Sequence, residues 1–394
     1  MSGIFEGIRV LDLGRFISAP FGSQLMADLG ADVIKVERAG KGDDGRRLGP
    51  FHNGVSLYVP TFSRNKRGVT VNFRSDEGKR VFRELVRSAD VIYENFRPGT
   101  MAKMGFSYDE VQKINPRIIM VSISGFGQEG KYRDRAAFND VVTAMSCFMS
   151  LNNLPDGTPM GTGVPAADHI AGLYASFAVA AALYDRQRTG KGQYIDMAMM
   201  DCMISFLETS IPNASANGFN SGHRKHTGDP LTVPTNTFRT KDGYVNIHAG
   251  TDPNYRNFAP LTKDPVLNDP KYQKVEARMQ DYDLINDTTA KWFLTVTCEE
   301  AEKMLSDAGI PVAIVYDLQR LLHDSNTYDR HQVVMMDIPG AGEVGFPGNP
   351  IKMRTRPLGP NHRAPMMGEH NQEIYTSLGF TEEELKTLQA NGDI

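Results

Sequence analysis

The chain has 394 residues, of which 40% are hydrophobic and 23% charged, and its formal net charge is −4 at pH 7. This length predicts two domains, and the weak negative charge gives no support to nucleic-acid binding. The three cysteines and nine histidines show neither disulfide nor metal-ligand spacing. The N-terminal residues lack the regions of a signal peptide, so we expect a cytoplasmic, metal-free protein.

The N-terminal part alternates between strand and helix patterns. A strand at 8–13, a helix at 21–29 and a strand at 31–37 predict a βαβ unit with the short loops of a parallel sheet. The alternation continues as strand, helix, strand, helix and strand at 69–73, 76–88, 91–93, 108–114 and 118–122. Such an α/β domain binds its ligand at the carboxyl ends of the strands.

Three segments that follow these strands contain residues suited to ligand binding. Residues 36–47 hold three glycines and four basic residues, which suits phosphate or adenosine recognition but also fits a solvated loop. Residues 93–100 place Asn95 and Phe96 before a Pro-Gly turn, and residues 122–130 are rich in glycine. No GxGxxG fingerprint occurs in these loops, which argues against a dinucleotide dehydrogenase.

Asp168 stands where the small, uncharged run 163–167 gives way to a helical pattern over 170–185. An Asp at such a junction is typical of a helix N-cap. The same place also puts a carboxylate at the positive end of a helix, where it can act as a nucleophile. The local spacing leaves both roles open. Polar residues interrupt the helical pattern, so we expect no membrane span.

The character of the chain changes after about residue 210. The polar, turn-rich stretch 212–222 predicts a linker. Two short strands predict a hairpin around residues 241–243, and helices are expected at 285–293 and 298–308. The proline-rich end of the chain is expected to wrap back over the first domain. The predicted division is a large domain at 1–210, a linker at 211–225, a small α+β domain at 226–325 and a return segment at 326–394.

Several segments, in their order and spacing, resemble the family III CoA-transferases, also called the CaiB/BaiF family. They are GIRVLD at 7–12, LGADVIKVE at 29–37, ENFRPG at 94–99, NPRII at 115–119, SGFG at 124–127, the segment ending in Asp168 and GKGQYID at 190–196. The resemblance implies an α/β fold: a Rossmann-like large domain with a parallel sheet built from both chain ends, plus a smaller α+β domain. It also implies a homodimer of two interlocked chains.

By this resemblance Asp168 matches the catalytic aspartate of the family. Five residues fall where members contact the nucleotide and pantetheine of CoA: Arg38, Arg74, Asn95, Phe96 and Lys103. The implied reaction moves CoA from an acyl-CoA thioester to a small free carboxylic acid, with no permanently bound cofactor. An aspartate nucleophile would pass through an acyl–aspartyl anhydride and an aspartyl–CoA thioester. Small residues such as Ala19, Gly125 and Gly127 would let N–H donors approach each oxyanion.

Two alternatives to CoA transfer remain at this point. Racemase members of the family carry a His-Asp pair where this chain has Asn139–Asp140. His169 adjoins Asp168, but neighbours on a helix diverge by about 100°, so we expect His169 to be a packing or surface residue. An α-methylacyl-CoA racemase-like isomerase is therefore disfavoured. The second alternative is a non-catalytic CoA-binding protein.

The likeness is closest to members that use small acids, including acetyl-CoA:oxalate and formyl-CoA:oxalate CoA-transferases. Ile17 stands where some oxalate-using members have Gln, and Ile17 and Phe138 predict a more apolar acyl pocket. The chain has no tetraglycine loop over the nucleophile, so Gly250 is the nearest candidate for a lid. The basic turn 223–226 could pair with the distal charge of a dicarboxylate, although a solvated turn also fits. The acids exchanged stay open.

Overall fold

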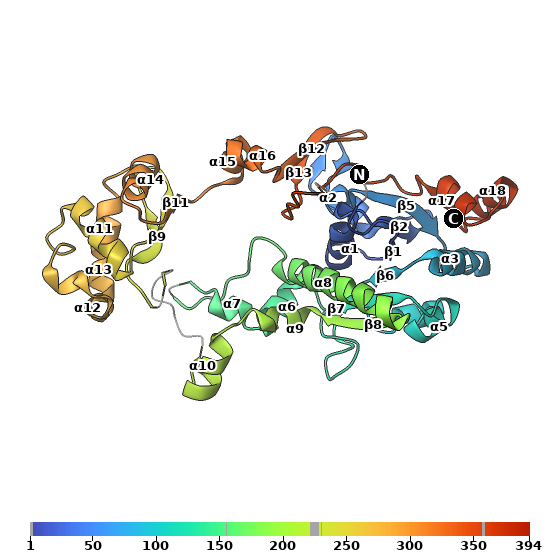
Figure 1. Ribbon diagram of the computed structural model, residues 1–394, viewed down its shortest axis with the longest axis horizontal. Coiled ribbons are helices and arrows are strands. Elements are labelled where there is room, and N and C mark those ends of the chain that lie inside the picture. Colours follow the sequence, from blue (N-terminus) through green and yellow to red (C-terminus); the bar gives the residue numbers. More distant parts are fainter. Residues whose placement is uncertain (1–2, 155, 221–227, 230, 357–358) are drawn as a thin grey trace. The chain divides into compact units, whose positions relative to one another are not determined.

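The computed structural model describes residues 3–154, 156–220, 228–229, 231–356 and 359–394. The chain forms two compact units, drawn in Figure 1. Unit 1 comprises Met1–Leu151, Gly161–Asn220 and Ser325–Ile394, and unit 2 comprises Asn152–Met160 and Ser221–Asp324. Each unit contains its own hydrophobic core.

A six-stranded parallel sheet in the order β5-β2-β1-β6-β7-β8 forms the centre of unit 1. Its strands are β1 (Arg9–Asp12), β2 (Asp32–Arg38), β5 (Lys66–Val71), β6 (Val91–Glu94), β7 (Ile119–Ser124) and β8 (Gln193–Ala198). The chain adds strands on one side of β1 and then returns to its other side at β6. A ligand crevice is therefore expected at the carboxyl ends of these strands, where the strand order reverses.

Helices cover both faces of this sheet, because alternate residues of each strand point to opposite faces and both sets are apolar. One face packs against α1 (Ser18–Asp28), α6 (Asn139–Met145), α8 (Ala166–Thr189) and α9 (Met199–Ser205). The other face packs against α3 (Asp76–Ser88), α5 (Tyr108–Ile114), α17 (Asn371–Ser377) and α18 (Glu382–Ala390). The helices α1 and α8 approach so closely that Gly172 of α8 leaves no room for a side chain. A Cβ at this position would lie 2.7 Å from the carbonyl oxygen of Ser18 in α1.

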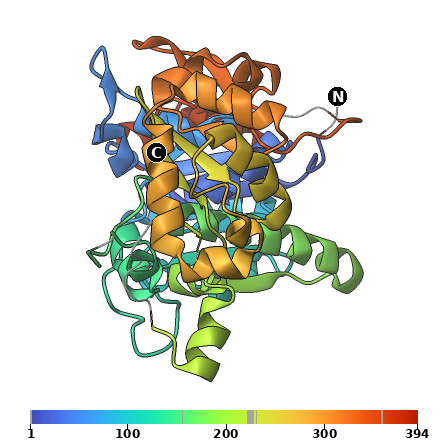
Figure 2. The ribbon, with the colours of Figure 1, turned by 90° about the vertical axis from the view of Figure 1, so that its left-hand side faces the viewer.

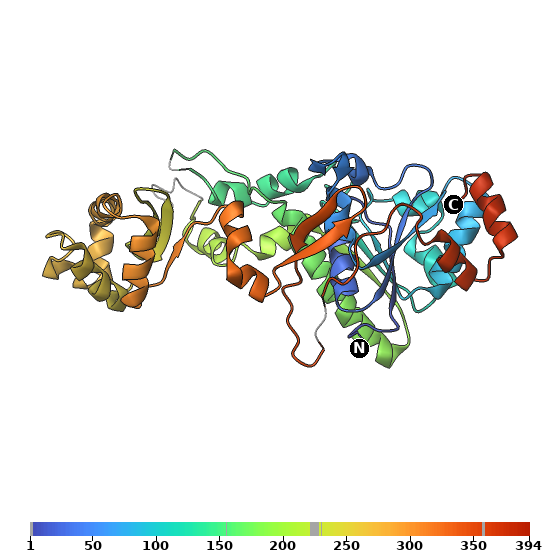
Figure 3. The same ribbon diagram turned by 90° about the horizontal axis from the view of Figure 1, so that it is seen from above.

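Short elements complete unit 1. They are η1 (Asp44–Arg47), β3 (Phe51–His52), β4 (Val55–Ser56), α2 (Tyr58–Ser63), α4 (Thr100–Met104), α7 (Phe148–Leu151), α10 (Ser210–Asn217), α16 (Ser325–Asp329), β12 (Val333–Ile338) and β13 (Gly342–Pro347). The strands β12 and β13 pair as an antiparallel hairpin, drawn in orange in Figure 3.

The C-terminal segment returns to the edge strand β5 (Figure 1). The N–H of His370 donates to the carbonyl of Gly68 at 2.9 Å, and the Tyr375 hydroxyl donates to the carbonyl of Thr70 at 2.7 Å. In the described part of the chain, however, all six strands of the sheet come from residues before 199. The expectation that the sheet is built from both chain ends is therefore wrong: the C-terminal segment supplies helices beside β5 and a separate hairpin.

Unit 2 contains a three-stranded antiparallel sheet in the order β11-β10-β9, with β9 (Thr235–Arg239), β10 (Tyr244–His248) and β11 (Val312–Ile314). The predicted hairpin is thus confirmed. The other elements, gold to orange in Figure 2, are α11 (Asp252–Thr262), η2 (Pro270–Gln273), α12 (Val275–Gln280), α13 (Tyr282–Phe293), α14 (Cys298–Asp307) and α15 (Leu318–His323). An aromatic cluster fills the core, in which the rings of Phe238 and Phe293 stack at 5.0 Å.

The stretch predicted as a linker is partly helical. The helix α10 runs over Ser210–Asn217 and ends at Gly218, which adopts a φ of 66°. Pro212 lies in the first turn, where its missing N–H breaks no helical hydrogen bond. Alanines at 214 and 216 favour the helix. The expectation of turns rather than a helix is therefore wrong over 212–217. The role of 211–225 as a linker stays a prediction, and residues 221–225 lie outside the described residues.

Among the described residues, α8 is the one helix that is long and apolar enough to cross a membrane. Its inner face packs on the sheet and on α1, and a core helix passes the same test of length and composition. Its outer face exposes Leu173, Phe177 and Tyr184, which are 54%, 74% and 69% exposed. Unit 1 therefore presents an apolar stripe along α8.

Candidate active site

Asp168 lies in the first turn of α8 and lines a cavity of about 830 Å³, the catalytic cavity. The N-cap residue of α8 is Pro165, so Asp168 does not cap its own helix. The backbone and the hydroxyl of Ser18, the first residue of α1, both hydrogen-bond with the Asp168 carboxylate. The carboxylate therefore caps α1, and the cap expected at α8 is corrected to this neighbouring helix.

Burial raises the pKa of Asp168 to about 6. The charge of nearby His169 and the two hydrogen bonds from Ser18 oppose this rise, and the Asp140 carboxylate adds to it. A carboxylate with this pKa is mostly ionised at neutral pH and is more basic than an ordinary Asp. Asp168 therefore has the ionisation state that a nucleophile needs.

This pKa predicts how activity depends on pH. Because only the ionised carboxylate attacks, kcat/KM is expected to rise with pH through about 6 and to level off above it. Below the pKa the rate should fall by about tenfold per pH unit. A pH profile of CoA exchange under conditions where the protein stays folded measures this. A flat profile between pH 5 and 7, within roughly twofold, would contradict an essential Asp168 carboxylate.

Asn139 caps the helix that carries Asp168. Its Oδ1 accepts the N–H of Ala167 at 3.0 Å, and its Nδ2 donates to Oδ1 of Asp140 at 2.9 Å. An amide at this position exchanges no proton near neutral pH, which disfavours racemase chemistry. The ring of His169 instead packs edge-on against Phe21 at 4.8 Å, so the prediction of a packing residue is confirmed.

Asn95 holds the β1–α1 loop, which we define as residues 13–17. Its Oδ1 accepts the N–H of Arg15 at 2.8 Å, and its Nδ2 donates to the Arg15 carbonyl at 2.8 Å and to Oγ of Ser18 at 3.0 Å. Asn95 lines the catalytic cavity, but both ends of its amide are engaged by the protein. Its geometry fits support of the loop as well as the predicted contact with CoA.

Ile17 and Phe138 both line the catalytic cavity. Ile17 is buried, whereas Phe138 is 71% exposed and meets Phe16 edge-on at 6.4 Å. Tyr58 lines the same cavity; burial, together with the charge of Asp168, raises its pKa to about 12. The acyl-pocket role of Ile17 and Phe138 stays a prediction.

Ala19, Gly125 and Gly127 were expected to let N–H donors approach the oxyanion. Of these three, Gly125 lines the catalytic cavity. The N–H of Gly127 instead donates to Oγ of Ser124 at 2.9 Å, so this group is occupied. Ala19 is fully buried within α1. Gly125 is therefore the member of this set that a bound thioester can approach.

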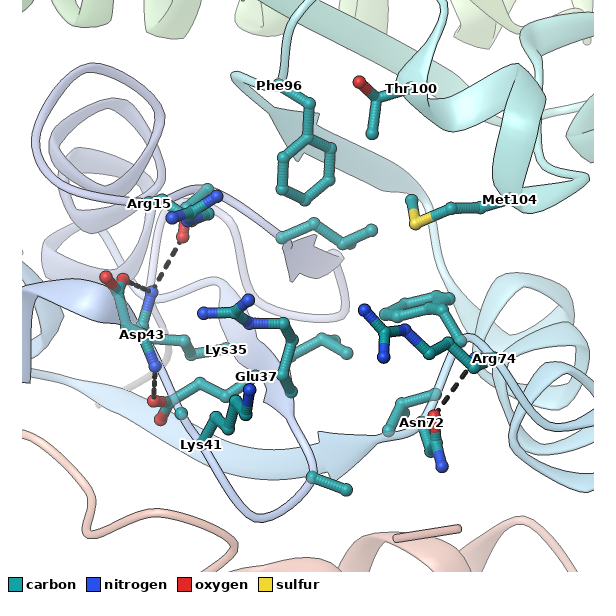
Figure 4. A pocket seen from close by; sticks show the side chains of 18 of the residues that line it. Arg15, Lys35, Glu37, Lys41, Asp43, Asn72, Arg74, Phe96, Thr100 and Met104 are labelled. Atoms are coloured by element: carbon teal, nitrogen blue, oxygen red, sulfur yellow. Dashed lines mark hydrogen bonds and ion pairs between the residues drawn. The ribbon is translucent and has the colours of Figure 1, made fainter.

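A second cavity of about 790 Å³, the nucleotide cavity, opens at the carboxyl ends of β1, β2 and β5. Four of the five predicted CoA residues line it: Arg38, Arg74, Phe96 and Lys103. In Figure 4 the guanidinium of Arg74 projects into the cavity from one side and the ring of Phe96 from another. Arg15, Phe96 and Thr100 line both cavities, so the two adjoin.

The charge balance of the nucleotide cavity is positive. Its two carboxylates are neutralised by partners, since Glu37 pairs with Arg46 and Asp43 pairs with Lys35 at 2.9 Å. Within the described ranges, four lining cations have no carboxylate partner: Lys41, Arg74, Lys79 and Lys103. Such a group of cations suits the phosphates of a nucleotide.

The sequence profile of CoA-transferase family III matches residues 5–371. The chain belongs to this family. It is 35% identical over 392 residues to succinyl-CoA–D-citramalate CoA-transferase of Chloroflexus aurantiacus, covering 98% of this chain and 96% of that protein. Acetyl-CoA:oxalate CoA-transferase of Acetobacter aceti is 35% identical over 353 residues, 89% of each chain. The crystal structure of a CaiB/BaiF family protein from Brucella suis matches with a TM-score of 0.87 and 32% identity, over 96% of this chain and all of that one.

These findings confirm the family predicted from the ordered segments, including its likeness to oxalate-using members. This protein is therefore a CoA-transferase that transfers CoA between acids, with a CoA thioester as substrate. A non-catalytic CoA-binding protein is not supported.

Sequence reasoning missed several residues of this CoA-transferase that line the cavities, above all Arg15, Tyr58 and the buried Asp43–Lys35 pair. One signal was present: Lys35 stands inside the apolar strand β2, and a lysine buried in a strand needs a charged partner. Gly250 belongs to unit 2, where its carbonyl accepts from Nη2 of Arg278 at 2.6 Å. Its lid role stays a prediction, and the turn 223–226 lies outside the described residues.

Proposed function

We propose that this CoA-transferase exchanges CoA between small dicarboxylic acids through a covalent intermediate on Asp168. The observation that carries the proposal is the position of Asp168. It is a largely ionised, partly buried carboxylate that lines the catalytic cavity. This cavity is large enough for an acyl group and adjoins the cationic nucleotide cavity.

The reaction needs four steps that balance without another cofactor. The Asp168 carboxylate attacks the thioester carbonyl, the C–S bond breaks, and CoA thiolate leaves an acyl–aspartyl anhydride. The thiolate then attacks the aspartyl carbonyl and releases the donor acid, which leaves an aspartyl–CoA thioester. The acceptor carboxylate attacks that thioester and displaces CoA thiolate. The thiolate finally attacks the acceptor's acyl carbon, which regenerates Asp168.

Each step passes through a tetrahedral oxyanion, which N–H donors stabilise. Gly125, the residue after β7, lines the catalytic cavity and is the candidate donor. Its missing side chain makes room for Ala137, which occupies the place that a Cβ at Gly125 would take. Water must be kept out, because an anhydride hydrolyses readily. Ile17, Phe138 and Met199 give the wall of the cavity apolar surface that favours this exclusion.

The proposed substrate class follows from the charges of the catalytic cavity. Four arginines line it, and three of them have no carboxylate partner within the described part of the chain: Arg97, Arg133 and Arg135. A second carboxylate on the substrate would pair with such a cation. The relatives described above are named for D-citramalate and oxalate, both diacids, which supports the same class for this chain.

The proposal is tested by incubating the protein with succinyl-CoA or acetyl-CoA and a panel of mono- and dicarboxylic acids, with mass spectrometry of the CoA products. We expect exchange with short dicarboxylic acids to exceed exchange with monocarboxylic acids of equal length. Equal or better use of monocarboxylates would contradict the substrate class. Absence of exchange across the panel would contradict the proposed function.

We also propose that the active form is an interlocked homodimer. The exposed apolar stripe on α8, formed by Leu173, Phe177 and Tyr184, supports this, because an exposed apolar face of this kind marks an interaction surface. Analytical ultracentrifugation would measure the mass of the particle, and a monomer at micromolar concentration would contradict the proposal.

A further inference from the structure

Four charged side chains lie buried together beneath the β1–α1 loop. Nζ of Lys35 lies 2.9 Å from Oδ2 of Asp43, and Nζ of Lys66 lies 2.7 Å from Oδ2 of Asp12. None of the four is more than 5% exposed. The proposed chemistry uses none of them. Burying four charges is costly unless each is paired and hydrogen-bonded, so the arrangement requires an explanation.

The four side chains hold the backbone of the β1–α1 loop and of the first turn of α1. Lys35 donates to the Gly14 carbonyl at 2.9 Å, and Asp12 accepts the N–H of Gly14 at 2.8 Å. Lys66 donates to the carbonyl of Pro20 at 2.8 Å. The loop is thus fixed on both sides of its central residues.

Asp43 holds the most strained point of this loop. Its carboxylate accepts a hydrogen bond from the backbone N–H of Phe16. Phe16 adopts a φ of 60°, a left-handed conformation that a residue with a Cβ adopts only when its surroundings impose it. Two residues further on, Ser18 hydrogen-bonds with Asp168. The path from Asp43 to the nucleophile therefore runs through three residues of backbone.

Asp43 also belongs to the loop after β2 that lines the nucleotide cavity. Its own N–H donates to Oε2 of Glu37 at 2.7 Å, which ties it to the ion pair between Glu37 and Arg46. One carboxylate therefore joins the loop expected to bind the CoA nucleotide to the loop that faces the nucleophile.

We propose that Asp43, paired with Lys35, is a positioning residue for Asp168: it holds the strained β1–α1 loop so that Ser18 hydrogen-bonds with the carboxylate, and it couples the nucleotide-binding loop to this arrangement. The inference rests on the proposed role of Asp168 as nucleophile. It assigns Asp43 no contact with the reacting atoms.

The consequence of losing Asp43 follows from the contacts of Asp168. Without its anchor, Phe16 relaxes toward a negative φ and Ser18 moves away from the carboxylate. The hydrogen bonds from Ser18 lower the pKa of Asp168, so their loss raises it. The other titratable groups that face Asp168 are Tyr58 on α2, Asp140 on α6 and His169 on α8. The charge of Asp43 acts directly on one of them, because it adds to the rise in the pKa of Tyr58.

The test uses Asp43→Asn, which keeps the size of the side chain, and the double variant Asp43→Asn with Lys35→Met, which removes the lysine left without a partner. We expect both variants to fold and to lose about tenfold in kcat. We also expect the acidic limb of the pH profile of kcat/KM to move to higher pH, because the pKa of Asp168 rises. The KM for acyl-CoA should stay within about threefold, because the unpaired cations of the nucleotide cavity remain.

Arg47→Met is the matched control. Arg47 lies in the same loop, is exposed and lines neither cavity, and its partner Asp44 also pairs with Arg15 and Arg38. The Arg47 variant should leave kcat and the acidic limb of the pH profile unchanged. Two outcomes would overturn the inference. In the first, the Asp43 variants fold and show normal kcat and an unchanged acidic limb of the pH profile. In the second, neither variant folds, which indicates a purely structural role for Asp43. A different variant shows whether the proposed function itself is wrong. If Asp168 is not the nucleophile, Asp168→Asn retains CoA transfer, whatever the Asp43 variants do.

Discussion

Replacing Asp168 with Asn is expected to abolish CoA exchange, with a loss on the order of 10⁴-fold or more in kcat, as is common when a covalent nucleophile is removed. The amide keeps the size of the side chain and can still accept a hydrogen bond from Ser18. It cannot form the anhydride. Because the nucleotide cavity is lined by other residues, the affinity for CoA should be retained. Exchange assays and calorimetric CoA titrations measure the two effects.

The matched control for this variant is Asp185→Asn. Asp185 lies on the same helix, is exposed and pairs with Arg188 at 2.9 Å. Its replacement changes the charge of α8 without touching either cavity, so exchange should remain at the unmodified level. Transfer by the Asp168 variant at a comparable rate would refute the covalent mechanism. Loss of both transfer and CoA binding would indicate a structural role for Asp168.

Replacing Arg133 and Arg135 together with Met is expected to raise the KM for a dicarboxylic acceptor by about 10- to 100-fold. A hydrogen bond to a charged group contributes roughly 1.5–3 kcal/mol, and 1.4 kcal/mol corresponds to tenfold in affinity. The guanidinium of Arg135 lies 5.8 Å from the ring centroid of Phe126 and 5.7 Å from that of Tyr132, so aromatic rings orient it. The KM of each acceptor acid measures the effect.

Lys131→Met provides the control, since Lys131 lies in the same loop and packs on Tyr132 but does not line the catalytic cavity. It removes a positive charge and should change the KM of the acceptor by less than about twofold. In the double arginine variant, the KM for a monocarboxylic acceptor should change little. An equal rise for mono- and dicarboxylic acceptors would contradict recognition of a distal carboxylate by these arginines.

The sequence was most informative where local pattern and burial agree. The helices at 76–88 and 108–114 have the predicted bounds, because each follows a Ser N-cap and carries an apolar face. The strands of the parallel sheet are apolar on both faces and therefore stand out as short hydrophobic runs. The sequence misleads at α10, where a run of Asn, Ser and Gly predicts turns although Ala and an early Pro support a helix.

The candidate site was predictable only in part. Asp168 and the cationic residues could be placed from the ordered family segments, because their types suit the chemistry. Their partners could not: Asn95 bonds with Arg15 across a sequence separation of 80 residues, and the helix that Asp168 caps is α1. The left-handed conformation of Phe16 leaves no trace in the residue type. Such contacts depend on the tertiary fold and follow from no local pattern.

The central claim is that Asp168 becomes covalently bonded during each turnover. In the proposed series of steps, the acceptor carboxylate attacks the aspartyl–CoA thioester, so the bridging oxygen of the second anhydride comes from the acceptor. The thiolate then attacks the acceptor's acyl carbon, which leaves this bridging oxygen on Asp168. Turnover with an acceptor acid that carries a heavy oxygen isotope in its carboxylate, followed by peptide mass spectrometry, tests this directly. We predict the label in the peptide that contains Asp168; unlabelled Asp168 after many turnovers would contradict the mechanism.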